Sequence, residues 1–156
     1  MATYSVAFAH GDSTSLWFPG PCPGQCSQLS AVRAELSSKK VTLHIMYTTC
    51  LHCNVTNGSA LLQIFYNDCL KALRLINSPG RKLKRFLADD YGLLNESCTL
   101  LASLQQQISV SLLGVKGHYN GTKREIQHDL NAEAHHILHS FLKEINHASP
   151  WHIFTI

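Results

Sequence analysis

The sequence predicts an α/β fold of three layers, with helices on both faces of a central mixed sheet. Segments with strand-like and helix-like apolar spacing alternate along the chain, and no internal repeat or linker interrupts them. The chain has 156 residues, of which 45% are hydrophobic and 15% are charged. This length allows a sizeable core, and this composition excludes a disordered chain. We therefore expect residues 1–156 to form a single domain.

The first half of the chain predicts two strands separated by a long helix. Residues 4–9 have the composition of a strand, and the Pro- and Gly-rich residues 19–24 indicate a break in regular structure. Apolar residues recur at roughly helical spacing over 28–51, and a polar loop with Asn and Gly is expected at 54–59. The short apolar run 60–67 predicts a buried strand of a mixed or parallel sheet.

The second half predicts three helices and one strand. Helical spacing over 70–76 stops at a turn signal that contains Pro and Gly, and a further helix is expected over 89–106. Residues 108–115 indicate a strand, and residues 116–128 indicate a polar loop. The last helix is expected over 130–145, where apolar residues share one face.

Several short motifs fall on these segments in a fixed order. Residues 33–36 read Arg-Ala-Glu-Leu, and residues 66–73 place an Asp directly after a strand. Residues 89–94 read Asp-Asp-Tyr-Gly-Leu-Leu at a helix start. Residues 115–118 read Val-Lys-Gly-His at a strand end, and residues 131–135 read Asn-Ala-Glu-Ala-His at the start of a helix. In order and spacing, these motifs resemble the type 1 ribonuclease H domains of retrotransposon reverse transcriptases.

The resemblance covers roughly residues 4–145 and implies a ribonuclease H-like fold. It also implies an endonuclease, a hydrolase that cleaves the RNA strand of an RNA–DNA hybrid. In this family acidic residues bind two Mg²⁺ or Mn²⁺ ions, which suit hard oxygen ligands. By resemblance, Glu35 and Asp68 are metal ligands. His118 is expected to shuttle protons as product leaves, a role that suits its near-neutral pKa.

Two of the four acids of the family are not found. His135 stands where the fourth acid is expected, and a neutral imidazole is a poor ligand for magnesium. For the first acid, one register places His10-Gly11 where the family has Asp-Gly. The other register takes residues 4–17 as the second strand and its turn, so that the first strand is absent, and we favour it. In either register, we expect metal-dependent hydrolysis to be weak or lost.

The expected partner is an RNA–DNA hybrid or another nucleic acid. The formal net charge of +3 permits a polyanionic partner without demanding one. Lys116, Lys123 and Arg124, in the polar loop of the C-terminal signature, are the candidate nucleic-acid contacts. The basic stretch 81–85 is a second candidate surface for phosphate. Hybrid recognition is expected to use minor-groove sugar and phosphate contacts.

Other interpretations remain open. The same fold is compatible with a non-catalytic module that binds nucleic acid or protein. Six cysteines and three Asn-x-Ser/Thr triplets favour instead a small secreted, disulfide-bonded glycoprotein. No signal peptide or transmembrane segment is visible, so we expect an intracellular chain with reduced thiols, a monomer that does not bind membranes. Zinc sites are weaker hypotheses, either at His135 and His139 or at four of the cysteines, at positions 22, 26, 50 and 53.

Overall fold

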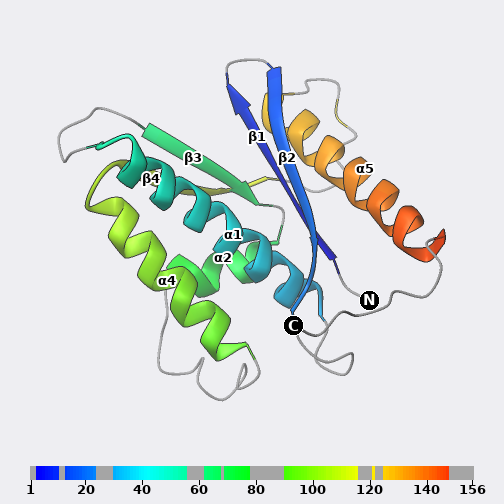
Figure 1. Cartoon of the computed structure of the whole chain (residues 1–156), viewed down its shortest axis with the longest axis horizontal. Coiled ribbons are helices and arrows are strands. Elements are labelled where there is room, and N and C mark those ends of the chain that lie inside the picture. The colour runs from blue at the N-terminus through cyan, green and yellow to red at the C-terminus, as the bar shows by residue number, and fades with distance from the viewer. Residues whose placement is uncertain are drawn as a thin grey trace.

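The computed structural model of the chain describes residues 3–10, 13–23, 30–55, 62–67, 69–77, 90–115, 121 and 125–147. Over these residues the fold is mixed α/β, as predicted (Figure 1). The order of elements is β1 (Thr3–His10), β2 (Ser13–Pro21), α1 (Ala31–His52), β3 (Leu62–Asn67), α2 (Leu70–Asn77), α4 (Tyr91–Gln105), β4 (Ser109–Gly114) and α5 (Ile126–His147). None of the helices described is both long enough and apolar enough to cross a membrane.

The described strands pair as two separate two-stranded sheets. β1 and β2 form an antiparallel hairpin with an irregularity after Phe8, and β3 pairs with β4 in parallel, from Leu62↔Ser109 to Asn67↔Gly114. No described strand pairs with both β1 and β3, so the hydrogen-bonded ladder is interrupted between the two pairs. The single central sheet expected from the sequence is therefore not formed by the strands that the structure describes.

The hairpin shows where local sequence signals misled the prediction. Residues 4–9 lie within β1 as predicted, but residues 19–21, expected to break regular structure, continue β2 to its end. Among the described strands β2 pairs only with β1, so no second neighbour requires the N–H groups that Pro19 and Pro21 lack, and proline is tolerated there. Both prolines are exposed.

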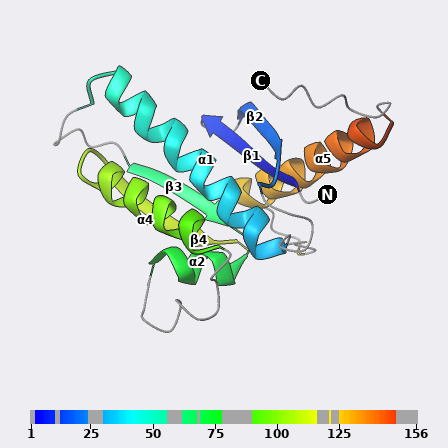
Figure 2. The same ribbon diagram turned by 60° about the horizontal axis from the view of Figure 1, so that its bottom comes forward.

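The core lies between α1, α2 and α4. Its buried side chains are Leu36, Leu43, Cys50, Ala72, Ile76, Leu94, Leu101, Leu104 and Ile108. Val110 and Leu112 of β4 pack against this cluster, so the three helices cover one side of the parallel strand pair (Figure 2). The hairpin lies between α1 and α5, and both helices pack against β1 (Figure 1). The fold thus rests on two packing units that share α1.

Candidate functional site

The carboxyl ends of β3 and β4 bring two of the sequence motifs to the same edge. The parallel register places Asn67 opposite Gly114, and buried Val115 follows directly. Asp68 comes next after Asn67, and Lys116 to His118 come next after Val115. The carboxyl edge of parallel strands is where open α/β folds place their functional groups. Asp68, Lys116 and His118 themselves lie outside the described residues.

Glu35 and His135, the other two predicted site residues, are carried by helices on either side of the hairpin. Glu35 is half-buried on α1, and His135 is half-buried on α5. In Figure 1 the hairpin separates these two helices. In the part of the chain that the structure describes, no group of three or more His, Cys, Asp or Glu side chains is arranged to hold a metal ion. Glu35 and His135 are therefore carried by two different helices, α1 and α5, which both pack against β1.

A buried ion pair joins two motifs that sequence reasoning treated separately. Arg33 on α1 donates from Nη1 to Oδ1 of Asp90 at 2.6 Å, and the two side chains are 11% and 9% exposed. The Arg33 Nε–H also donates to the carbonyl of Pro23 at 2.6 Å. The first helix is thereby tied both to the residue that precedes α4 and to the segment that follows β2. Both motifs are visible in the sequence, but nothing in the local pattern pairs residues 57 positions apart.

Asp90 has a different role from the one that its position suggests. It is the N-cap of α4, where an aspartate side chain commonly accepts a hydrogen bond from the first helical turn. Here no such side-chain bond is formed. The carboxylate accepts a hydrogen bond from Arg33 instead, which gives the buried guanidinium a counter-charge. The ion pair thus fixes the position of the Arg33–Leu36 motif relative to α4.

The four-cysteine zinc hypothesis does not agree with the geometry. The thiol of Cys22 lies 3.4 Å from the hydroxyl of Ser37, near the start of α1. Cys50 lies in the last full turn of the same helix. At 1.5 Å of rise per residue, Ser37 and Cys50 are about 20 Å apart along the helix axis. Cys22 and Cys50 are therefore too far apart to bind one ion; Cys26, the fourth proposed ligand, lies outside the described residues.

The described thiols also give no disulfide framework. Cys22, Cys50, Cys53 and Cys98 are free thiols, two of them buried. Burial raises the pKa of Cys98, whose thiol lies 3.8 Å from the carbonyl oxygen of Ile76. Burial and, to a lesser extent, the neighbouring Cys53 raise the pKa of Cys50. Burial therefore favours the protonated form of the Cys50 and Cys98 thiols.

Lys123, Arg124 and the basic stretch 81–85 lie outside the described residues. No protein-family model matches the chain. No curated protein matches it either.

Proposed function

We propose that the chain is a ribonuclease H-like nucleic-acid-binding domain that descends from an RNA–DNA hybrid ribonuclease and in which metal-dependent hydrolysis is weak or lost. The observation that carries this proposal is the parallel β3–β4 register. Because Asn67 pairs with Gly114, the residues that follow each strand start from one edge. Those residues are the Asp68 motif and the Val-Lys-Gly-His motif, which the resemblance assigns to one site.

The Arg33–Asp90 ion pair gives independent support. Arg33 belongs to the motif that carries Glu35, and Asp90 belongs to the Asp-Asp-Tyr-Gly motif at the start of α4. The resemblance rests on the order of these motifs along the chain, and the ion pair shows that two of them are also in contact. A chance match between short motifs gives no reason for such a contact.

The interrupted sheet agrees with the second of the two registers considered for the amino-terminal segment. In that register residues 4–17 correspond to the family's second strand and its turn, and the first strand is absent. Among the described strands β1 pairs only with β2, although residues 13–17 form part of β2 and not of a turn.

The donor set accounts for the expected loss of catalysis. Magnesium needs hard oxygen ligands, and two-metal hydrolysis needs several carboxylates around two ions about 3.5–4 Å apart. Glu35 and Asp68 are the two candidate carboxylates, whereas His135 adds an imidazole from a helix beyond the hairpin. Two carboxylates do not complete a two-ion site, so we expect this chain to bind the hybrid and to hydrolyse it weakly or not at all.

Hybrid binding and cleavage by the full chain test the proposal. We expect binding that weakens steeply as salt rises, because phosphate contacts release counterions. We expect little or no magnesium-dependent cleavage. Asp68→Asn and Glu35→Gln are compared with Glu96→Gln, a matched control on exposed α4 surface. Robust cleavage that Asp68→Asn abolishes would show that catalysis survives, and absence of binding at low salt would contradict the whole proposal.

A further inference from the structure

The carboxyl end of α1 forms a compact turn with two hydrogen bonds. The Val55 N–H donates to the carbonyl of Cys50 at 2.9 Å, and the Asn54 N–H donates to the carbonyl of Leu51 at 3.2 Å. Asn54 has φ 50°, the left-handed conformation that this cap requires. This pair of bonds is the Schellman motif, which commonly brings together the side chains at the positions of Cys50 and Val55. Val55 does pack against the core cluster that contains Cys50.

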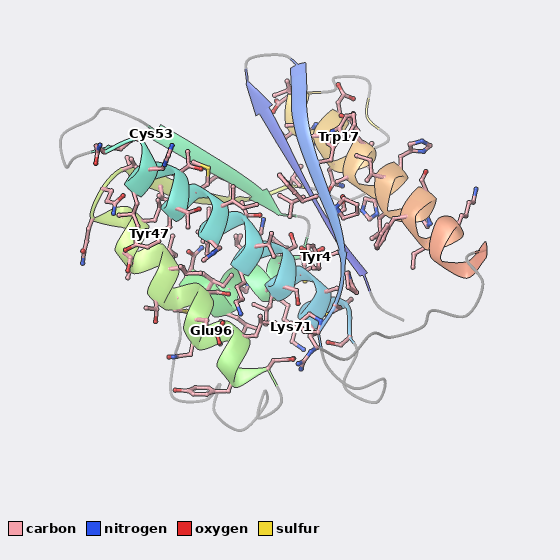
Figure 3. All side chains as sticks on the ribbon, viewed as in Figure 1. Tyr4, Trp17, Tyr47, Cys53, Lys71 and Glu96 are labelled. Atoms are coloured by element: carbon pink, nitrogen blue, oxygen red, sulfur yellow. The ribbon has the colours of Figure 1, made fainter. Side chains whose placement is uncertain are left out.

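Two thiols bracket this turn in contrasting environments. Cys50 is 3% exposed and belongs to the core cluster, whereas Cys53, the C-cap residue, is exposed (Figure 3). Helical geometry places Cα atoms three residues apart at about 5 Å. Disulfides accept Cα separations of roughly 4.4–6.8 Å.

We propose that Cys50 and Cys53 are a redox-active thiol pair that low-molecular-weight disulfides, of which oxidised glutathione is the probe, convert to an intrahelical disulfide. This proposal does not depend on the proposed function. The exposed Cys53 thiolate attacks one sulfur of the glutathione disulfide, and the departing thiolate takes up a proton as reduced glutathione. The Cys50 thiolate then attacks the Cys53 sulfur of the mixed disulfide and releases a second reduced glutathione. Two protein thiols are oxidised, and one glutathione disulfide is reduced.

The order of the two steps follows from the environments. Thiol–disulfide exchange needs an accessible thiolate, and Cys53 is the accessible member of the pair. Cys50 is buried, so it is protected from glutathione in solution and reacts with a sulfur already attached three residues away. Side chains three apart have Cβ atoms about 5–6 Å apart, and a disulfide needs roughly 3.5–4.5 Å. The last turn must therefore tighten for the disulfide to form.

The experiment uses the folded full chain with Cys69→Ser. This substitution leaves Cys50 and Cys53 as the cysteines of the tryptic peptide 41–71, which contains no Lys or Arg before Lys71. After treatment with oxidised glutathione, we expect this peptide to lose two hydrogen atoms in mass. Addition of Cys53→Ser should leave Cys50 unmodified in the folded chain. Addition of Cys50→Ala should instead stop the reaction at a stable glutathione adduct on Cys53.

Several outcomes would overturn the proposal. They are a stable glutathione adduct on Cys53 when Cys50 is present, modification of Cys50 in the Cys53→Ser variant, and an unchanged peptide. Circular dichroism confirms that each variant is folded before treatment. If Cys50→Ala does not fold, the Cys69→Ser chain and its Cys53→Ser variant still decide between a disulfide and none.

Discussion

Replacement of Asp90 by asparagine removes the negative charge beside the Arg33 guanidinium and keeps the shape of the side chain. Both members of this pair are about nine-tenths buried, at 11% and 9% exposed. Loss of one partner of a buried ion pair typically costs about 3–5 kcal/mol, because the other charge stays buried without compensation. Arg33 keeps its bond to the Pro23 carbonyl, so we expect the lower end, about 3 kcal/mol.

Urea unfolding followed by circular dichroism measures this cost. With a slope of about 2 kcal/mol per molar urea, the midpoint should fall by about 1.5 M in Asp90→Asn. The exposed pair between Lys40 and Glu96 provides the control, because Glu96→Gln should cost less than about 1 kcal/mol. The double variant Arg33→Met/Asp90→Leu should lie within about 1 kcal/mol of the parent, since a buried pair can be replaced by apolar groups. Equal effects of Asp90→Asn and Glu96→Gln would refute this reasoning.

Further predictions concern packing, backbone conformation and pH, each measured as a change in the free energy of unfolding. Gly20→Ala should destabilise the hairpin by about 1–3 kcal/mol, because the new Cβ would lie 2.5 Å from Oη of Tyr4; an unchanged midpoint would show that the ring moves aside freely. Asn54→Val should cost about 1–2 kcal/mol through its positive φ, whereas Asn54→Gly should cost little; equal losses would argue against the left-handed cap. Leu104→Ala should lower the free energy of unfolding by about 3–5 kcal/mol, because Leu104 is 0% exposed. A loss below about 1 kcal/mol would place Leu104 outside the core. Burial raises the pKa of Cys98 above its ordinary 9.0, so the stability that the protonated thiol contributes should be fully present below pH 9.0 and be lost as pH rises through the folded-state pKa. The decrease in the free energy of unfolding at alkaline pH should be smaller in Cys98→Ala.

Much of the fold was predictable, because most elements carry their own local signal. The strand expected over 108–115 is β4 at Ser109–Gly114, and the helix expected over 28–51 is α1 at Ala31–His52. Ser30 caps this helix by accepting the Arg33 N–H at 3.1 Å. These segments were identified because apolar periodicity and buried faces coincide.

Elements without such a signal were predicted less well. α5 begins at Ile126, earlier than the apolar face beginning at residue 130 indicated, because polar residues support its first turn. There the His128 Nδ1 accepts the Glu125 N–H at 3.2 Å. The interruption between the two strand pairs was missed for a different reason, since strand order depends on contacts between distant segments.

The candidate site was predictable as a set of motifs and not as a geometry. The meeting of Asn67 and Gly114 at one edge depends on a parallel register that neither strand specifies alone. The contact between Arg33 and Asp90 likewise depends on how α1 packs against α4. The order of the motifs along the chain predicts the members of the site, whereas tertiary packing determines which of the described residues are in contact.

The most direct test follows the amide signals of the isotope-labelled full chain by nuclear magnetic resonance while an RNA–DNA hybrid is added at low salt. If the hybrid binds at the carboxyl edge of the parallel strands, the largest shifts will fall at Asn67, Gly114, Val115 and the residues that follow each strand. Shifts confined to α5 or to the β1–β2 hairpin, or no shifts at all, would contradict the assignment of this edge as the binding site.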